Sequence, residues 1–141
     1  MKTIEYNKLT DKFFGINCRV QEIGKEFNEK FSLIVCNPPY METGRGDKAK
    51  DESISLCKSE VNLKLNELFI SAKRCLKYGG RISLVHRADR LCDIFCLMRE
   101  NGIEPKEMQF VYGGEKTPYL VMVMGVKGGK PGLKVLSPQK N

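Results

Sequence analysis

The stretch from Phe31 to Tyr40, FSLIVCNPPY, constrains the fold more than any other part of the chain. It begins as an apolar run of strand type and ends abruptly in Asn37-Pro38-Pro39-Tyr40. Each proline fixes φ and has no N–H to give to a neighbouring strand, so the pair ends the strand. The turn offers backbone carbonyls, the side-chain carbonyl of Asn37 and the flat ring of Tyr40. Such groups suit a planar amine.

A helix and a second apolar strand follow. Apolar residues recur at spacings of three and four after Ser59, which predicts a helix over about Glu60–Tyr78 that Gly79-Gly80 end. Arg81–His86 (RISLVH) is then typical of a buried strand. Two apolar strands joined by one helix predict a βαβ unit, whose strands are parallel. Met41–Lys58, before the helix, has no sustained apolar period and is predicted to be a long loop.

The rest of the chain predicts one more helix and an antiparallel strand pair. The helix is expected over Arg90–Asn101, and the strands over Glu107–Tyr112 and Tyr119–Val126. Lys127–Asn141 is rich in Gly, Pro and Lys and is predicted to be an exposed basic tail.

Residues 1–30 form a poorly defined lead-in, in which only Gly15–Val20 alternates as a short strand would. A chain of 141 residues buries one core, so residues 1–141 are expected to form a single α/β domain.

The two predicted parallel strands bring the polar residues at their carboxyl ends to one edge of the sheet. In an open parallel sheet, ligands bind at the carboxyl ends of the strands. Asn37-Pro38-Pro39-Tyr40 and His86-Arg87 are the carboxyl ends of the two strands, so they should share one rim. His86 has two interpretations there: a packed ring that simply ends a strand, or a contact to substrate.

Charge and apolar patterning favour a cytoplasmic protein with an anionic partner. Lys and Arg outnumber Asp and Glu by 24 to 17, and the net charge of +7 favours nucleic acid. The amino terminus has no secretory pattern, and the longest apolar stretch, Tyr119–Met124, is too short to cross a membrane. The six cysteines sit in apolar patterns and are predicted to be reduced. Cys92 and Cys96 lack a second ligand pair nearby, so we expect no zinc site.

Several motifs resemble one enzyme family. Asn37-Pro38-Pro39-Tyr40 after an apolar strand is similar to the signature of S-adenosylmethionine-dependent methyltransferases that modify planar amino groups. The segments Leu76–Leu91 (LKYGGRISLVHRADRL), Leu97-Met98-Arg99 and Val126–Val135 (VKGGKPGLKV) resemble the bacterial tRNA(Val) adenine-N6 methyltransferase family. The resemblance runs from about Ile16 to Pro138.

The resemblance implies a cofactor, a partner and a site. The cofactor would be S-adenosylmethionine and the substrate an adenine of tRNA. Asn37 and the Pro38 carbonyl would accept the two hydrogens of the adenine amino group, with Asn37 shared with the cofactor, and Tyr40 would stack on a base rotated out of its stack, with Pro39 completing the turn. Contacts to RNA are expected from the basic residues and one histidine, namely His86, Arg87, Arg90, Lys127, Lys130 and Lys134.

Departures from the family indicate a partial fold. The family's Gly-rich turn and the strands that hold the cofactor have no counterpart upstream of Ile16. Two positions that are acidic in the family correspond to Arg19 and Ser32 here, and a family histidine corresponds to Ser59. The chain therefore resembles the carboxyl-terminal half of such an enzyme: a partial Rossmann-like class I methyltransferase sheet without the amino-terminal cofactor-binding strands. Activity is expected only where the missing half is supplied.

This leaves an apolar strand edge to be covered, and proteins normally cover such edges. We expect the missing half, residues 1–30 or a second copy of the chain to cover it. Two other functions stay open. One is a non-catalytic RNA-binding or interaction remnant of the enzyme, and the other is methylation of a different planar amine, such as guanine N2 or a glutamine amide.

Overall fold

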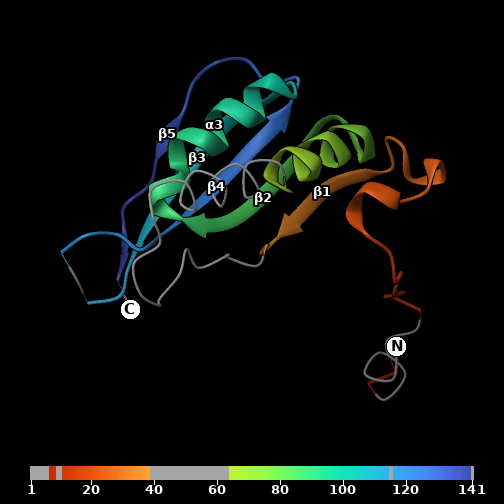
Figure 1. Cartoon of the computed structure of the whole chain (residues 1–141), viewed down its shortest axis with the longest axis horizontal. Helices are drawn as coiled ribbons and strands as arrows, with labels where there is room; N and C mark the ends of the chain where they lie inside the picture. The colour runs from red at the N-terminus through yellow and green to blue at the C-terminus, as the bar shows by residue number, and fades with distance from the viewer. Residues whose placement is uncertain (1–6, 9–10, 39–63, 115, 141) are drawn as a thin grey trace, which may run out of the picture.

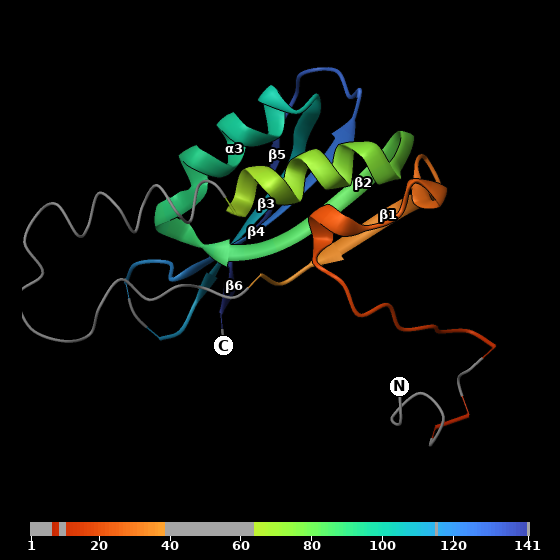
Figure 2. The same cartoon turned by 45° about the vertical axis from the view of Figure 1, so that its right-hand side comes forward.

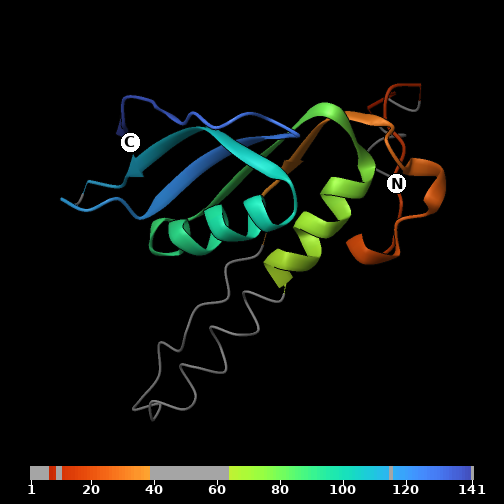
Figure 3. The ribbon, with the colours of Figure 1, turned by 90° about the horizontal axis from the view of Figure 1, so that it is seen from above.

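The computed structural model describes residues 7–8, 11–38, 64–114 and 116–140. These residues form one six-stranded sheet in the order β1-β2-β4-β3-β5, with β6 also pairing with β3 (Figure 1). Two longer helices, one described over residues 64–75 and the other α3, Leu91–Glu100, lie on the same face of the sheet (Figure 3). No helix of the described residues is long and apolar enough to span a membrane. The predicted loop Met41–Lys58 lies outside the described residues.

The predicted βαβ unit is confirmed. β1, Phe31–Cys36, and β2, Leu76–Arg87, are parallel neighbours joined by the chain that carries the helix of residues 64–75. That helix ends three residues before the predicted end, and β2 begins five residues early. Regular pairing starts only at Leu33 and Arg81, because the strand register shifts between Phe31 and Leu33.

The antiparallel pair is confirmed as well. β3, Ile103–Tyr112, and β4, Leu120–Lys127, pair along most of their length, and β4 lies between β2 and β3. Gly125 of β4 lies under α3, where a Cβ would overlap the Met98 side chain and stand 2.9 Å from Cγ2 of Ile103. Glycine at this position therefore lets α3 pack closely on the sheet.

The core lies between the sheet and the two helices. Alternate residues of β2 and β4 point toward the helices and are buried, as the period of two requires. The helix of residues 64–75 contributes Phe69, whose side chain is 0% exposed. The largest fully buried side chains are Phe69, Leu76, Ile82, Leu84, Ile94, Met98, Ile103, Val121 and Val123.

The prediction of a strand over Gly15–Val20 is wrong. The residues before β1 form two short 3-10 turns, η1, Val20–Glu22, and η2, Lys25–Phe27, and the described part of residues 1–19 contains neither helix nor strand. Arg74 holds this lead-in to the helix of residues 64–75, because its guanidinium donates to the Ile23 carbonyl at 2.6 Å and to Oδ1 of Asn28 at 2.6 Å.

The carboxyl-terminal segment is exposed, as predicted, but it is not a plain tail. Its backbone forms two short strands, β5, Lys134–Val135, and β6, Gln139–Lys140, which both run parallel to β3. The Leu136 N–H donates to the Met108 carbonyl at 2.8 Å. The outer edge of β3 offers N–H and C=O groups, and the tail satisfies part of them.

The opposite edge of the sheet is β1. The expectation that residues 1–30 cover this edge is wrong for their described part, because β1 pairs only with β2 there. Leu33 and Val35 are 55% and 73% exposed. The reason is that Arg74 and the stacked rings of Phe27 and Phe31 direct residues 23–28 beside the helix of residues 64–75, away from the free edge of β1.

Candidate functional site

The carboxyl ends of β1 and β2 form one rim, as the sequence predicts. Cys36, the last residue of β1, is paired with Leu84, so Asn37 and Pro38 leave the strand beside the end of β2. Asn37 is exposed and Pro38 is half-buried. Pro39 and Tyr40 lie outside the described residues. The rim thus presents the Asn37 amide at the end of an edge strand.

His86 lies inside the fold. Its side chain points to the helix-covered face together with Ile82 and Leu84, and it is 3% exposed. Burial lowers the pKa of His86 below 6.5, and the positive charge of Arg90 lowers it further. The imidazole is therefore neutral at pH 7. This favours the interpretation of His86 as a packed ring over a direct contact to RNA.

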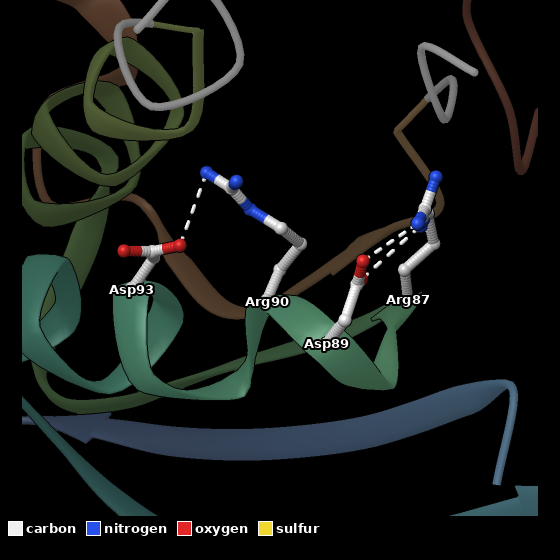
Figure 4. Close-up of polar contacts among 4 residues, drawn as sticks. All are labelled: Arg87, Asp89, Arg90 and Asp93. Atoms are coloured by element: carbon white, nitrogen blue, oxygen red, sulfur yellow. Dashed lines mark hydrogen bonds and ion pairs between the residues drawn. The ribbon is translucent and has the colours of Figure 1, made fainter. Parts of the chain in front are cut away.

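Arg87 and Arg90 stand on the rim, each with a carboxylate (Figure 4). Arg87 donates two hydrogen bonds to Asp89, from Nη2 to Oδ2 at 2.6 Å and from Nε to Oδ1 at 3.1 Å. Nη2 of Arg90 lies 3.0 Å from Oδ2 of Asp93. The Arg87 side chain is 38% exposed and that of Arg90 only 11%. Arg87 is therefore the more accessible cation of the two.

A short turn sets these side chains in place. β2 passes into η3, Ala88–Arg90, and then directly into α3. The Ala88 N–H donates to the Tyr119 carbonyl at 3.1 Å, which ties the turn to the start of β4. Tyr119 is half exposed at the same rim.

The two carboxylates of the described rim are engaged. A cofactor ribose is commonly held by an acidic side chain that accepts from its hydroxyl groups. Here Asp89 and Asp93 each pair with an arginine. The two positions that are acidic in the resembled family, Arg19 and Ser32, are exposed and carry no carboxylate. Neither of these two rim carboxylates is therefore free to accept a hydrogen bond from a cofactor ribose.

The predicted lysine contacts do not join this rim. Lys127 lies at the other end of β2, where its Nζ donates to the Leu76 carbonyl at 2.7 Å and to Glu29 at 3.0 Å. Lys130 and Lys134 follow it on the carboxyl-terminal segment. The Arg81–Val126 pair and the Arg87–Leu120 pair lie six residue steps apart along β2, a distance of about 20 Å at about 3.3 Å per residue. The six proposed RNA contacts therefore fall into two separate groups.

Two open hollows in the described surface also lie away from the rim. One of about 490 Å³ is lined by Asn28, Glu29, Ile70, Lys73, Arg74 and Lys127. The other, of about 410 Å³, lies at the start of β1 and β2 and is lined by Ser32, Leu33, Lys77, Tyr78, Gly79, Gly80 and Arg81. Lys127 and Arg74 in the first hollow already bind backbone carbonyls. Neither hollow contains Asn37.

Curated relatives carry the same name as the resembled family. A tRNA1(Val) (adenine(37)-N6)-methyltransferase of Porphyromonas gingivalis is 34% identical over 67 residues, which cover 48% of this chain and 26% of the relative. The resemblance to these methyltransferases is confirmed. A protein of the same name from Shewanella sp. is 29% identical over 80 residues, or 57% of this chain and 33% of the relative. The chain thus matches about a third of their length or less, and no protein-family profile matches it.

Solved methyltransferase structures share the fold. A predicted O-methyltransferase from Agrobacterium tumefaciens superposes with a TM-score of 0.71 at 15% identity, over 99% of this chain and 61% of that one. A putative DNA modification methylase from Thermus thermophilus, complexed with S-adenosyl-L-methionine, gives a TM-score of 0.54 at 20% identity, over 74% of this chain and 50% of that one. The predicted α/β fold is therefore confirmed, and it is shared with these methyltransferase structures.

Proposed function

We propose that this chain supplies the substrate-binding side of an S-adenosylmethionine-dependent adenine-N6 methyltransferase that acts on tRNA. One observation carries the proposal: Asn37-Pro38 ends an edge strand at the carboxyl rim of a methyltransferase sheet, beside the end of β2. The names of the curated relatives support adenine of tRNA as the substrate. The net charge of +7 supports a polyanionic partner.

The acceptor groups act by position. The side-chain carbonyl of Asn37 and the backbone carbonyl of Pro38 each accept one hydrogen of the exocyclic amine. Holding both hydrogens in the ring plane directs the nitrogen lone pair out of that plane, where it is available to an electrophile. Tyr40 is assigned the stacking contact to the extruded base. We assign Arg87, at the same rim, a contact to a phosphate next to that base.

The methyl donor requires more than the described residues. When bound, S-adenosylmethionine supplies an electrophilic methyl group. Among the described rim residues, Asn37 is the one assigned a contact to the donor. The nearby carboxylates of Asp89 and Asp93 are each paired with an arginine. We therefore expect the groups that hold the donor to come from residues beyond those described, and catalysis to depend on them.

Binding experiments separate the two sides of the site. Fluorescence anisotropy would compare tRNA1(Val) transcripts that carry adenine or unsubstituted purine, which lacks the amino group, at position 37. Two lost hydrogen bonds of about 1 kcal/mol each predict that purine binds about 10- to 30-fold more weakly. Equal binding of the two transcripts would contradict the proposal.

Calorimetric titration with S-adenosylhomocysteine tests the donor side. No detectable heat is expected for the 141-residue chain alone. Micromolar binding would show that the chain holds the donor unaided and would exclude the non-catalytic alternative. If the chain binds adenine-containing tRNA selectively but never binds S-adenosylhomocysteine, the result supports a substrate-binding role only. If the chain does not bind tRNA, the result contradicts both the tRNA methyltransferase and the non-catalytic RNA-binding remnant.

A further inference from the structure

β1 is an exposed strand edge with an apolar face. On β1, Ile34 and Cys36 pack against the core on the helix side, so Leu33 and Val35 point to the other face. Those two side chains are 55% and 73% exposed, and no described residue pairs with the outer edge of the strand. An edge of this kind accepts a further strand through its backbone groups.

A second segment of the same chain has apolar side chains to bury. Residues 11–19 extend from the body of the fold (Figure 1 and Figure 2), and Phe14 of this segment stacks on Phe27 with ring centroids 6.4 Å apart. Phe13, Ile16 and Val20 are 57%, 51% and 37% exposed. Along residues 15–20, Ile16, Cys18 and Val20 alternate with Gly15, Asn17 and Arg19. This is the pattern of a strand with one apolar face, although no strand forms there.

The two surfaces complement each other. Residues 15–20 and β1, Phe31–Cys36, are each six residues long. A strand of residues 15–20 laid beside β1 can place Ile16, Cys18 and Val20 on the same face as Leu33 and Val35. Backbone groups that the edge leaves without a strand neighbour would then be paired, and the apolar side chains of both segments would be buried together.

We propose that two copies of this chain exchange these segments, so that residues 15–20 of each copy pair with the outer edge of β1 of the other. A second copy is the occupant that the described residues favour, because both complementary surfaces occur on one chain. Reciprocal exchange uses each surface once and closes a twofold dimer. The proposal does not depend on the methyltransferase function.

The oligomeric state in solution tests the exchange. Light scattering coupled to size-exclusion chromatography, with the full chain between about 1 and 100 µM, should show a rise from 16.0 kDa toward twice that mass. Because each copy carries a net charge of +7, the dimer should become stronger between 50 and 500 mM NaCl. A monomer throughout this range would overturn the proposal.

Two variants test the surfaces separately. Val35→Lys places a charge on the edge strand, and Ile16→Lys places one on the exchanged segment. Each alone should shift the chain to monomer. The matched control is Ile70→Lys, on the helix of residues 64–75, which is also 51% exposed and should leave the dimer intact. Circular dichroism confirms that each variant remains folded. A dimer that survives Ile16→Lys would contradict the exchange.

Mixing the two variants distinguishes exchange from direct pairing of β1 with β1. The Val35→Lys chain keeps its own exchanged segment, and the Ile16→Lys chain keeps an intact β1. Their mixture regains one of the two contacts, so it should dimerise more strongly than either variant alone. Failure of the mixture to dimerise, when wild type does, would show that the two surfaces do not meet across copies.

Discussion

Cys36 of β1 and Leu84 of β2 are register partners in a parallel pair, and this pairing brings Asn37 and Pro38 to the end of β2. Because the two strands run the same way, both chain segments leave the sheet at one rim. Arg87 and the turn η3 lie next along the same rim. The acceptor group of the proposed site thus follows the edge strand β1, and its cationic neighbour lies at the end of β2, the adjacent strand.

Removing the Asn37 amide should reduce the preference for adenine. Asn37→Ala takes away one of the two proposed acceptors, so its affinity for tRNA carrying adenine should fall toward that for purine at the same position. Asn37 is exposed beyond the end of β1, so stability should change by no more than about 0.5 kcal/mol. Anisotropy titrations with both transcripts measure the ratio. An adenine preference as large in Asn37→Ala as in wild type would show that Asn37 does not read the amine.

Protonation of His86 should destabilise the fold. Burial, assisted by Arg90, lowers the pKa of His86 from 6.5 in the native state. The unfolded chain therefore binds this proton at a higher pH than the native chain does. The stabilising contribution is complete above pH 6.5 and is lost as the pH falls through the lowered pKa of the native state.

His86 is the chain's single histidine, so this slope can be isolated. Urea unfolding at several pH values between about 5 and 8 gives the free energy of unfolding for wild type and for His86→Gln. The variant should lose the part of the slope that lies below pH 6.5, whatever its overall stability. Identical slopes for the two proteins would show that His86 ionises equally in the native and unfolded states.

Lys127 should support the fold, in contrast to its neighbours. Its Nζ binds the Leu76 carbonyl and Glu29, and its side chain is 16% exposed. Lys127→Met should therefore lower the free energy of unfolding by about 1–3 kcal/mol, because the half-buried carbonyl loses its donor. Lys130→Gln is the matched control, since that side chain is exposed and the change should leave stability within about 0.5 kcal/mol.

Lys130 and Lys134 are the lysines whose effect on RNA binding can be tested without a loss of stability. If Lys130 and Lys134 contact phosphates, each neutralisation should reduce the slope of log affinity against log salt by about 1. Anisotropy titrations between 50 and 300 mM NaCl measure that slope. An unchanged slope in the Lys130 and Lys134 double variant would show that the carboxyl-terminal segment does not contact RNA. It would not test the contacts proposed at the rim.

Phe69 and Ile70 are adjacent on one helix and should differ sharply. Phe69 is 0% exposed in the core, and Ile70 is 51% exposed. Phe69→Ala should cost about 3–5 kcal/mol, because it removes buried apolar surface and leaves a cavity. Ile70→Ala should cost far less. Urea unfolding of both variants checks the packing of the helix on the sheet, and equal losses would contradict it.

Local pattern was sufficient for most of the regular structure. The strand before Asn37, the helix α3 and the pair β3 and β4 follow from periodicity, and the parallel rim follows from the βαβ order. Two errors have a common cause. Gly15–Val20 has a strand pattern but pairs with no strand among the described residues, whereas Lys134–Val135 has little pattern but lies along the open edge of β3. A strand forms only where a partner edge is available, and the pattern does not reveal that.

The sequence by itself determined the turn at Asn37-Pro38, because prolines end a strand regardless of context. It also determined which face of each helix is buried. Only the tertiary structure decided that His86 lies inside while Arg87 lies at the surface, and that Lys127 binds Leu76 and Glu29 far from the rim. These depend on which elements pack together, which a local sequence pattern does not specify.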